Sequence, residues 1–331
     1  DNGLAKCLVN DSAADMGLTK ITCDEVKIES LGDLNNFPLL TEVSITNANI
    51  IDISALTDVP QLTKLNLSHN NITDTSTLTE LVALIELNLS SNLIQDSSAL
   101  VTLLAQLPQL SILNLDRLHK QYTVNINVEN LTDLTNLTNL TLNNNNVSNT
   151  SELSQLKSLT TLNIENIGYS FNSLSFLSGL TELNALNIGN NYGINDLSAL
   201  SQLTKLEKLN LSNLNITDYS PISSLSKLQT LHLDNQNYYS NTALDLDNFK
   251  LLTELTELNI NNIRNIENIS ALSTFTKLES LHASNINTAT IAFVNELPNI
   301  KVLDISSNSR LGDISPLENL TQLEELNINN N

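Results

Sequence analysis

A pattern of apolar residues, Leu-x-x-Leu-x-Leu, returns along almost the whole chain and constrains its fold more than any other feature. Successive returns are 22 to 27 residues apart. A near-constant period of this size indicates a solenoid, in which each repeat forms one coil that stacks on the next. The fourteen coils begin at Leu18, Leu40, Leu62, Leu84, Leu110, Leu137, Leu159, Leu183, Leu206, Leu228, Leu255, Leu278, Ile300 and Leu323.

Each coil contains the pattern of a short strand followed by a tight return. The fourth and sixth positions are apolar between polar neighbours, as in Leu65-Asn66-Leu67, which predicts a strand with one buried face. In returns such as residues 52–56, apolar residues recur every three positions, which favours a helix of three residues per turn. Fourteen strands about 4.8 Å apart would extend over roughly 60 to 65 Å, forming a long surface rather than a pocket.

The coil that begins at Leu62 places Leu65, Leu67, Asn70 and Ile72 at fixed offsets. This unit resembles the short leucine-rich repeat, of about 22 residues, found in internalin-type secreted and surface-bound bacterial proteins. The resemblance implies an α/β solenoid, a curved right-handed superhelix with a parallel β-sheet on its concave face. It also implies 3-10, short helical or extended returns on the convex face. For function the resemblance is less specific, because such repeats bind many partners.

The ninth position of the repeat departs from the family pattern in several coils. The family places there an asparagine whose side-chain amide hydrogen-bonds the backbone of adjacent coils. In the coils without this asparagine, we expect the buried turn amides to find other partners. Asparagine occupies the ninth position at 70, 92, 145, 191, 308 and 331, and the other coils have Val26, Ala48, Leu118, Ile167, Leu214, Gln236, Ile263 and Ile286.

The two ends of the repeat array differ. Leu4 and Cys7 lie on the apolar side of a helical pattern that Gly17 would end, so we expect residues 1–17 to form a helical N-terminal cap. Residues 18–331 would form the solenoid. Its last strand has no polar element after it, which leads us to expect that the C-terminal end is truncated.

The two cysteines, Cys7 in the expected cap and Cys23 in the first strand, fall at the same interface. They form either a disulfide that joins the cap to the first coil or two buried free thiols that pack as small apolar side chains. We favour the disulfide, because these are the only cysteines of the chain. A disulfide would imply an oxidising compartment.

The net charge limits the partners that we expect. The chain has 15 Lys and Arg against 36 Asp and Glu, a formal net charge of −21. Nucleic acids and anionic membrane surfaces are bound through excess positive charge, so we expect neither as a partner. No apolar run approaches the roughly 18 residues that would indicate a membrane-spanning helix, so we expect no membrane insertion.

No arrangement in the sequence predicts catalysis, and we expect neither an enzyme nor a cofactor or metal site. The strongest candidate for such a site is a column of outward-facing residues at the fifth position, His232, His282 and Asp304. Two coils separate the histidines, about 10 Å, and the residue between them is Asn259, a poor zinc ligand. We therefore expect exposed histidines on a binding face.

The outward positions of the strands predict a polar face without aromatic residues. Eight of the fourteen fifth positions are asparagine. Either this row is a generic ladder that favours solubility, which we prefer, or it binds a polar partner such as a glycan. Aromatic residues follow the strands instead, and three of the coils that carry them have added residues, with spacings of 27, 24 and 27 from Leu110, Leu159 and Leu228. There the aromatic residues could line one rim or merely pack against the added loops. These tyrosines are Tyr122, Tyr169, Tyr192, Tyr238 and Tyr239.

The sequence therefore predicts a non-catalytic recognition module, secreted or on a bacterial cell surface by resemblance to internalin-type adhesins. It would bind a protein or glycan through its concave face and its tyrosine-bearing rim. One alternative is a structural spacer that projects a downstream module. A third, an intracellular regulator of a phosphatase, is disfavoured by the cysteine pair.

Overall fold

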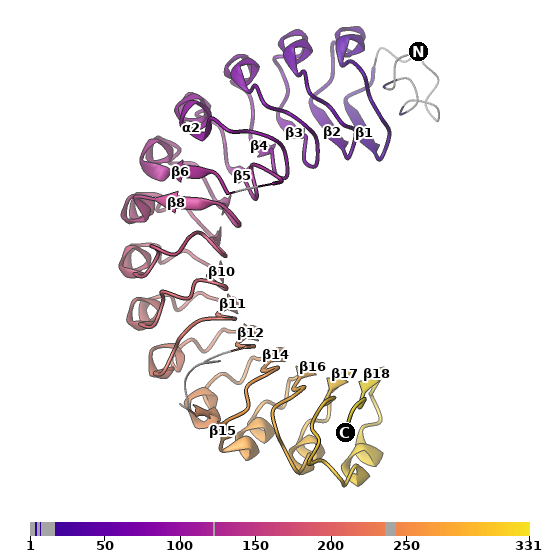
Figure 1. The fold of residues 1–331 in the computed structure, drawn as a ribbon, viewed down its shortest axis with the longest axis vertical. Coiled ribbons are helices and arrows are strands. Elements are labelled where there is room, and N and C mark those ends of the chain that lie inside the picture. The colour runs from indigo at the N-terminus through magenta and orange to yellow at the C-terminus, as the bar shows by residue number, and fades with distance from the viewer. Residues whose placement is uncertain (1–3, 5–6, 8–16, 122, 236–242) are drawn as a thin grey trace. The chain divides into compact units, whose positions relative to one another are not determined.

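The computed structural model of the chain consists of two compact units, residues 1–168 and 169–331, each of them a stack of coils. In each unit, parallel strands line the concave side and short helices lie on the convex side (Figure 1). These are the layers expected from the repeat pattern. The structure describes residues 4, 7, 17–121, 123–235 and 243–331.

In both units, each strand of the main sheet pairs with the strand of the next coil, in parallel and without a shift in repeat position, so that Leu65 lies opposite Leu87 and Leu186 opposite Leu209. The first unit contains β1 (Lys20–Asp24), β2 (Glu42–Thr46), β3 (Lys64–Asn66), β4 (Glu86–Asn88), β5 (Ile112–Asn114), β7 (Asn139–Thr141) and β9 (Thr161–Asn163). The second contains β10 (Ala185–Asn187), β11 (Lys208–Asn210), β12 (Thr230–His232), β14 (Glu257–Asn259), β16 (Ser280–His282), β17 (Val302–Asp304) and β18 (Glu325–Asn327).

The returns are 3-10 helices in all described coils but one, as their three-residue period predicts. A buried apolar residue, usually leucine, lies in each of these helices except η12. The amide that follows the helix donates three residues back, as from Phe37 to the Leu34 carbonyl. In the first unit they are η1 (Gly32–Asn36), η2 (Ser54–Asp58), η3 (Ser76–Glu80), η4 (Val128–Asp133) and η5 (Thr150–Gln155). In the second they are η6 (Ser175–Gly179), η7 (Ser198–Gln202), η8 (Ser220–Ile222), η9 (Leu246–Phe249), η10 (Ile269–Thr274), η11 (Ala292–Glu296) and η12 (Ser315–Asn319).

Longer coils add elements that the regular repeat lacks. The extra residues of the fourth coil turn its return into an α-helix, α2 (Ser97–Leu104), which Asp96 caps by accepting from the Ala99 amide at 2.9 Å. Two small parallel pairs of strands also form away from the main sheets. They are β6 (Asn125–Asn127) with β8 (Asn146–Ser148), and β13 (Leu244–Asp245) with β15 (Ile266–Glu267).

The start of the chain is joined to the first coil by a disulfide between Cys7 and Cys23, whose Cα atoms lie 5.3 Å apart. Of the expected cap, only Leu4, Cys7 and Gly17 lie within the described residues. Leu4 is helical and fully buried, which fits its proposed place on the apolar side of a cap. The disulfide agrees with the first of the two interpretations of the cysteine pair.

The turn after each strand requires a left-handed residue, a constraint that the repeat pattern alone did not reveal. The eighth position has a positive φ in all fourteen coils. Asparagine accepts this conformation more readily than other residues with a side chain, and it occupies nine of these positions. The remaining five are Glu25, His69, Ser91, Arg117 and Ser307.

The asparagines of the ninth position bind adjacent coils together, as the family pattern implies. Asn70 is fully buried, and its Oδ1 accepts from the amides of Ala48 and Ile50 in the preceding coil, both at 3.1 Å. Its Nδ2 donates to the Ile45 carbonyl at 2.7 Å and to the Leu67 carbonyl at 3.0 Å. One side chain thus satisfies four buried backbone groups.

Three coils without this asparagine use the backbone instead. Where the ninth residue is Ala48, Leu118 or Ile167, its own carbonyl accepts from an amide of the preceding coil at 3.0 to 3.1 Å. The donors are Ile28, Ile94 and Val147. A protein acceptor therefore replaces the missing amide side chain in these three coils, and the apolar ninth residue joins the core.

Aspartates cap the convex returns in both units. The Ser54 amide donates to Asp52 at 2.8 Å, and matching bonds to Asp74 and Asp313 are 2.9 Å long. Hydrogen bonds from the backbone amide and then from the hydroxyl of the serine lower the pKa of each aspartate below its ordinary value of 3.8.

Replacing Asn70 by Ala should lower the free energy of unfolding by roughly 2 to 5 kcal/mol, because it leaves several buried backbone groups without a partner. Asn71→Ala is the matched control. Its side chain accepts a bond of 3.2 Å from the Lys120 ammonium at the surface, so we expect less than about 0.5 kcal/mol. Urea denaturation measures both, and equal effects would contradict the assigned role of Asn70.

Replacing Arg117 by Asn should raise the free energy of unfolding by about 0.5 to 1 kcal/mol, because asparagine relieves the left-handed strain at φ 44°. Asn213→Ala, at the equivalent turn of the second unit, should lower it by about 1 kcal/mol. Thermal or urea denaturation measures both changes. Loss of stability in the Arg117 variant would show that its side chain, rather than its backbone, matters.

Acid should weaken the capped returns. The folded pKa of Asp52, Asp74 and Asp313 is lowered, so their contribution to stability is complete above 3.8 and is lost as the pH falls through the folded pKa. The triple Asp→Asn variant keeps an oxygen acceptor but cannot titrate. Its urea midpoint should therefore change less between pH 7 and pH 3 than that of the wild type, and an equal change in the two proteins would contradict the role of these caps.

Candidate binding surface on the strand face

The asparagines of the fifth position have a local structural role. In eight coils the side-chain oxygen of the fifth residue accepts from the amide of the seventh at 2.9 to 3.2 Å, closing a turn at the end of the strand. This turn accounts for most of the row without invoking a ligand. The acceptors are Asn66, Asn88, Asn114, Asn187, Asn210, Asn259, Asp304 and Asn327.

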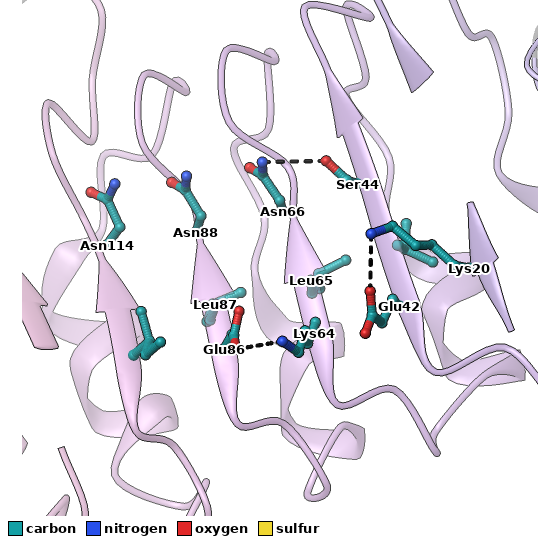
Figure 2. Close-up of a pocket in the computed structure, with 12 residues that line it drawn as sticks. Lys20, Glu42, Ser44, Lys64, Leu65, Asn66, Glu86, Leu87, Asn88 and Asn114 are labelled. Carbon is teal, nitrogen blue, oxygen red and sulfur yellow. Dashed lines mark hydrogen bonds and ion pairs between the residues drawn. The ribbon is translucent and has the colours of Figure 1, made fainter. Parts of the chain in front are cut away.

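In the first unit, the third position of the repeat, where each strand begins, carries a row of charges that the leucine pattern does not predict. Lys20 pairs with Glu42 at 3.3 Å, and Lys64 pairs with Glu86 at 2.7 Å (Figure 2). The hydrogen bond and charge of Glu86 raise the pKa of Lys64. The signal in the sequence was the alternation of lysine and glutamate one residue before the first buried aliphatic residue of successive strands.

This row borders a shallow depression of about 410 Å³ on the strand face of the first unit. Ser44 and Asn66 lie along its other side, where the Asn66 Nδ2 donates to the Ser44 hydroxyl at 3.3 Å (Figure 2). Ile112 of β5 closes one end. The depression thus combines charged, amide and apolar side chains on a rigid sheet.

The strand face of the second unit contains the predicted histidine column. The strand pairing places His232, Asn259, His282 and Asp304 side by side, as the repeat alignment requires. Their side chains do not converge, because His282 contacts Ser280 of its own strand at 3.1 Å and Asp304 accepts from the Ser306 amide at 2.9 Å. No group of three or more metal-ligating side chains occurs among the residues described.

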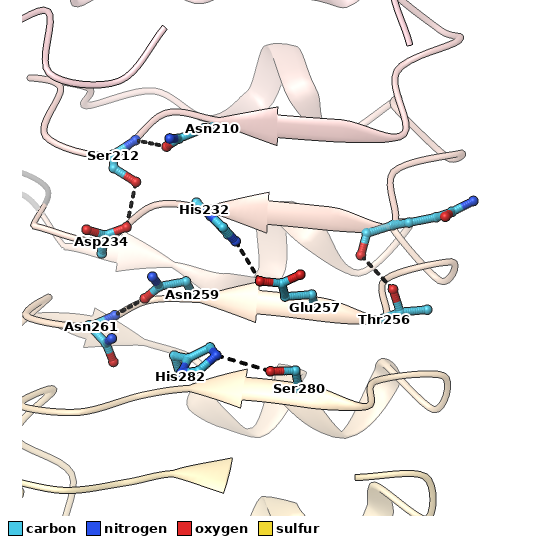
Figure 3. A network of polar contacts seen from close by, with 11 residues as sticks. Asn210, Ser212, His232, Asp234, Thr256, Glu257, Asn259, Asn261, Ser280 and His282 are labelled. Atoms are coloured by element: carbon cyan, nitrogen blue, oxygen red, sulfur yellow. Dashed lines mark hydrogen bonds and ion pairs between the residues drawn. The ribbon is translucent and has the colours of Figure 1, made fainter. Parts of the chain in front are cut away.

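His232 instead pairs with a carboxylate that the alignment did not single out. Its Nε2 lies 2.9 Å from Oε1 of Glu257, the first residue of β14 and the third of its repeat (Figure 3). In the same network, the Ser212 hydroxyl donates to Asp234 at 2.5 Å. Side chains of neighbouring strands therefore bind one another, and the face is held in place before any ligand arrives.

Two of the five predicted rim tyrosines lie in the described part of the chain, and both are exposed. Tyr169 exposes 97% of its surface and Tyr192 63%. They belong to adjoining loops after β9 and β10, since a side chain at Gly193 would lie 2.6 Å from the Phe171 carbonyl. The other three, Tyr122, Tyr238 and Tyr239, lie outside the described residues.

A sixth tyrosine has a different role. Tyr219, at the start of η8, is buried and packs edge-on against Phe249 at 5.8 Å. Burial raises the pKa of its hydroxyl. It is a core residue, so the exposure of Tyr169 and Tyr192 is not a general property of the tyrosines.

These coils, with their buried leucines, ninth-position asparagines and polar strand faces, define a leucine-rich-repeat solenoid. Internalin InlF from Listeria monocytogenes matches it with a TM-score of 0.76 and 26% sequence identity, over 98% of this chain and 93% of that one. The functional domain of InlJ from the same organism matches with a TM-score of 0.61 and 23% identity, over 91% and 72%. The protein thus resembles the internalins in both its repeat and its fold.

The same fold extends to a plant receptor. The ectodomain of the membrane receptor kinase GASSHO1/SCHENGEN3 from Arabidopsis thaliana, in complex with Casparian strip integrity factor 2, matches with a TM-score of 0.61 and 19% identity, over 89% of this chain and 39% of that one. No protein-family model matches the sequence, and the search of curated proteins finds no match. Within the described residues, no helix is both long and apolar enough to cross a bilayer.

Proposed function

We propose that the protein is a non-catalytic recognition module that binds a protein ligand through its strand faces and the exposed Tyr169 and Tyr192. The single observation that carries the proposal is the exposure of this tyrosine pair on adjoining loops. Large aromatic side chains at the surface are uncommon in a chain with only 4% aromatic residues. Tyrosine is also among the residue types that dominate binding energy at protein interfaces.

The construction of the strand face supports the same function. Buried apolar side chains hold the strands from below in all coils but the last, and hydrogen bonds between neighbouring side chains hold the surface above. A ligand that binds such a surface meets side chains that are already ordered, so less conformational entropy is lost on association. The module would therefore act by rigid presentation, without a chemical step.

The relatives support a protein ligand more directly than a glycan. The plant ectodomain of the same fold was solved with Casparian strip integrity factor 2 bound to it. The internalin neighbours, together with the disulfide between Cys7 and Cys23, favour a secreted or surface-exposed bacterial adhesin. A glycan ligand is the second candidate, favoured by the amide-rich strand face.

An array of purified extracellular protein domains, printed beside a glycan array, tests this function. We expect the wild type to bind at least one protein. The double variant that combines Tyr169→Ala and Tyr192→Ala should bind that protein tenfold or more weakly, the usual effect of losing interface hot spots. Leu251→Ala is the control, because Leu251 is 67% exposed in the same unit but lies away from these loops.

Three outcomes would count against the proposal in different ways. Binding only to glycans would replace the protein ligand by the second candidate. Protein binding that the double variant Tyr169→Ala and Tyr192→Ala retains would remove the tyrosines from the site. Absence of any binding would favour the spacer, since a module that only projects another needs no ligand of its own.

A further inference from the structure

One isoleucine of the first unit breaks a row of hydrogen-bonded hydroxyls at the start of the strands. In this row Thr41 donates to the Thr19 carbonyl at 3.2 Å, and Thr63 donates to the Thr41 carbonyl at 3.1 Å. The next residue in the row is Ile85, which cannot make this bond and exposes 42% of its surface. Compared with threonine at the same position, Ile85 lacks a hydrogen bond and is not buried in return. Stability therefore does not explain why an isoleucine occurs here.

A second exposed isoleucine lies beside it on the next strand. Ile112, whose amide donates to the Ile85 carbonyl at 3.0 Å, exposes 37% of its surface. It continues the row of charged residues that begins with Lys20 and lines the end of the depression. Ile112 is thus the apolar end of the charged row, and Ile85 lies immediately before β4, outside the residues that line the depression.

The charges of the row alternate strand by strand. From β5 to β1 the third positions are Ile112, Glu86, Lys64, Glu42 and Lys20, which read apolar, negative, positive, negative and positive. The lysines are partly exposed, at 62% and 45%, and exposed ion pairs contribute little to stability. The order of charges is thus available to select a partner.

The spacing of this row fits a helix better than an extended chain. Four strand intervals of about 4.8 Å span about 19 Å. Four turns of an α-helix advance about 22 Å, which leaves a mismatch of about 3 Å that side chains can take up. Four same-side steps of an extended chain cover about 27 Å, and the resulting mismatch of about 8 Å places its later side chains opposite the wrong charges.

We propose that the strand face of the first unit is a docking site for an amphipathic α-helix of a protein partner, laid across β5 to β1. An apolar side chain of the helix rests on Ile85 and Ile112. Side chains of alternating charge follow at intervals of three or four residues, a positive one opposite Glu86 first. The proposal rests on the proposed function in one respect, that the ligand is a protein.

Two synthetic helical peptides of the same composition test the charge order. The first carries leucine, lysine, glutamate, lysine and glutamate at alternating intervals of four and three residues, and the second exchanges every lysine with a glutamate. Each is titrated against the wild type and against a surface-swapped variant by fluorescence anisotropy. That variant combines Lys20→Glu, Glu42→Lys, Lys64→Glu and Glu86→Lys, which keeps both cross-strand ion pairs.

We expect the first peptide to bind the wild type roughly tenfold more tightly than the second, and the preference to reverse on the swapped surface. Equal affinity of the two peptides, or a preference that does not reverse, would overturn the proposal, as would the absence of binding by either. The function proposed above is tested through Tyr169 and Tyr192 of the other unit. A ligand that depends on those tyrosines can therefore be found even if both peptides fail.

A single substitution separates docking from folding. Ile85→Thr restores the side-chain donor of the row, so thermal stability should be unchanged or slightly higher, while affinity for the first peptide should fall several-fold. Ile51→Thr is the matched control, because Ile51 is 63% exposed in the same unit but lies away from this face. Retained peptide affinity in Ile85→Thr, or an equal loss in Ile51→Thr, would show that Ile85 is not the anchor.

Discussion

The stacking of one coil's leucines on those of the next is the interaction on which the whole structure depends. A single coil of 22 residues has its fourth and sixth side chains on one edge and cannot enclose them. Parallel pairing without a shift brings Leu65 beside Leu87 and repeats this contact along each unit. Each coil is therefore stable only through its neighbours, and stability is distributed over nearest-neighbour interfaces.

This stacking leaves many backbone groups inside the turns, and asparagine serves three different needs there. At the fifth position its oxygen closes a turn at the strand end. At the eighth it accepts a left-handed backbone, and at the ninth, as in Asn70, it satisfies backbone groups of two coils. The high asparagine content thus follows mainly from turn geometry and the satisfaction of buried polar groups. Ala48 and Leu118 show that a backbone carbonyl can replace the ninth side chain.

Function is then left to the positions that neither the core nor the turns use. These are the second and third positions of the repeat and the loops of the longer coils. Exposed residues such as Ile85, Ile112 and Tyr169 stand out there, because nothing in the architecture requires them. The proposed helix site and the tyrosine pair both consist of such residues, and they lie in different units, so each can be tested without disturbing the other.

The period of the leucines was enough to predict the strands, the 3-10 returns and the alignment of His232 with Asn259 and His282, since a stacked coil has only one way to place its apolar edge. The same alignment could not show that Glu257 reaches His232, that Asp304 is engaged in a turn, or that Lys20 and Lys64 pair across strands. Those outcomes depend on side-chain rotamers and on hydrogen bonds between coils 22 or more residues apart. The repeat by itself determined the fold and its polar face, whereas only the tertiary structure decided which side chains bind one another and which remain exposed to a partner, because that choice is made between neighbouring strands rather than along the chain.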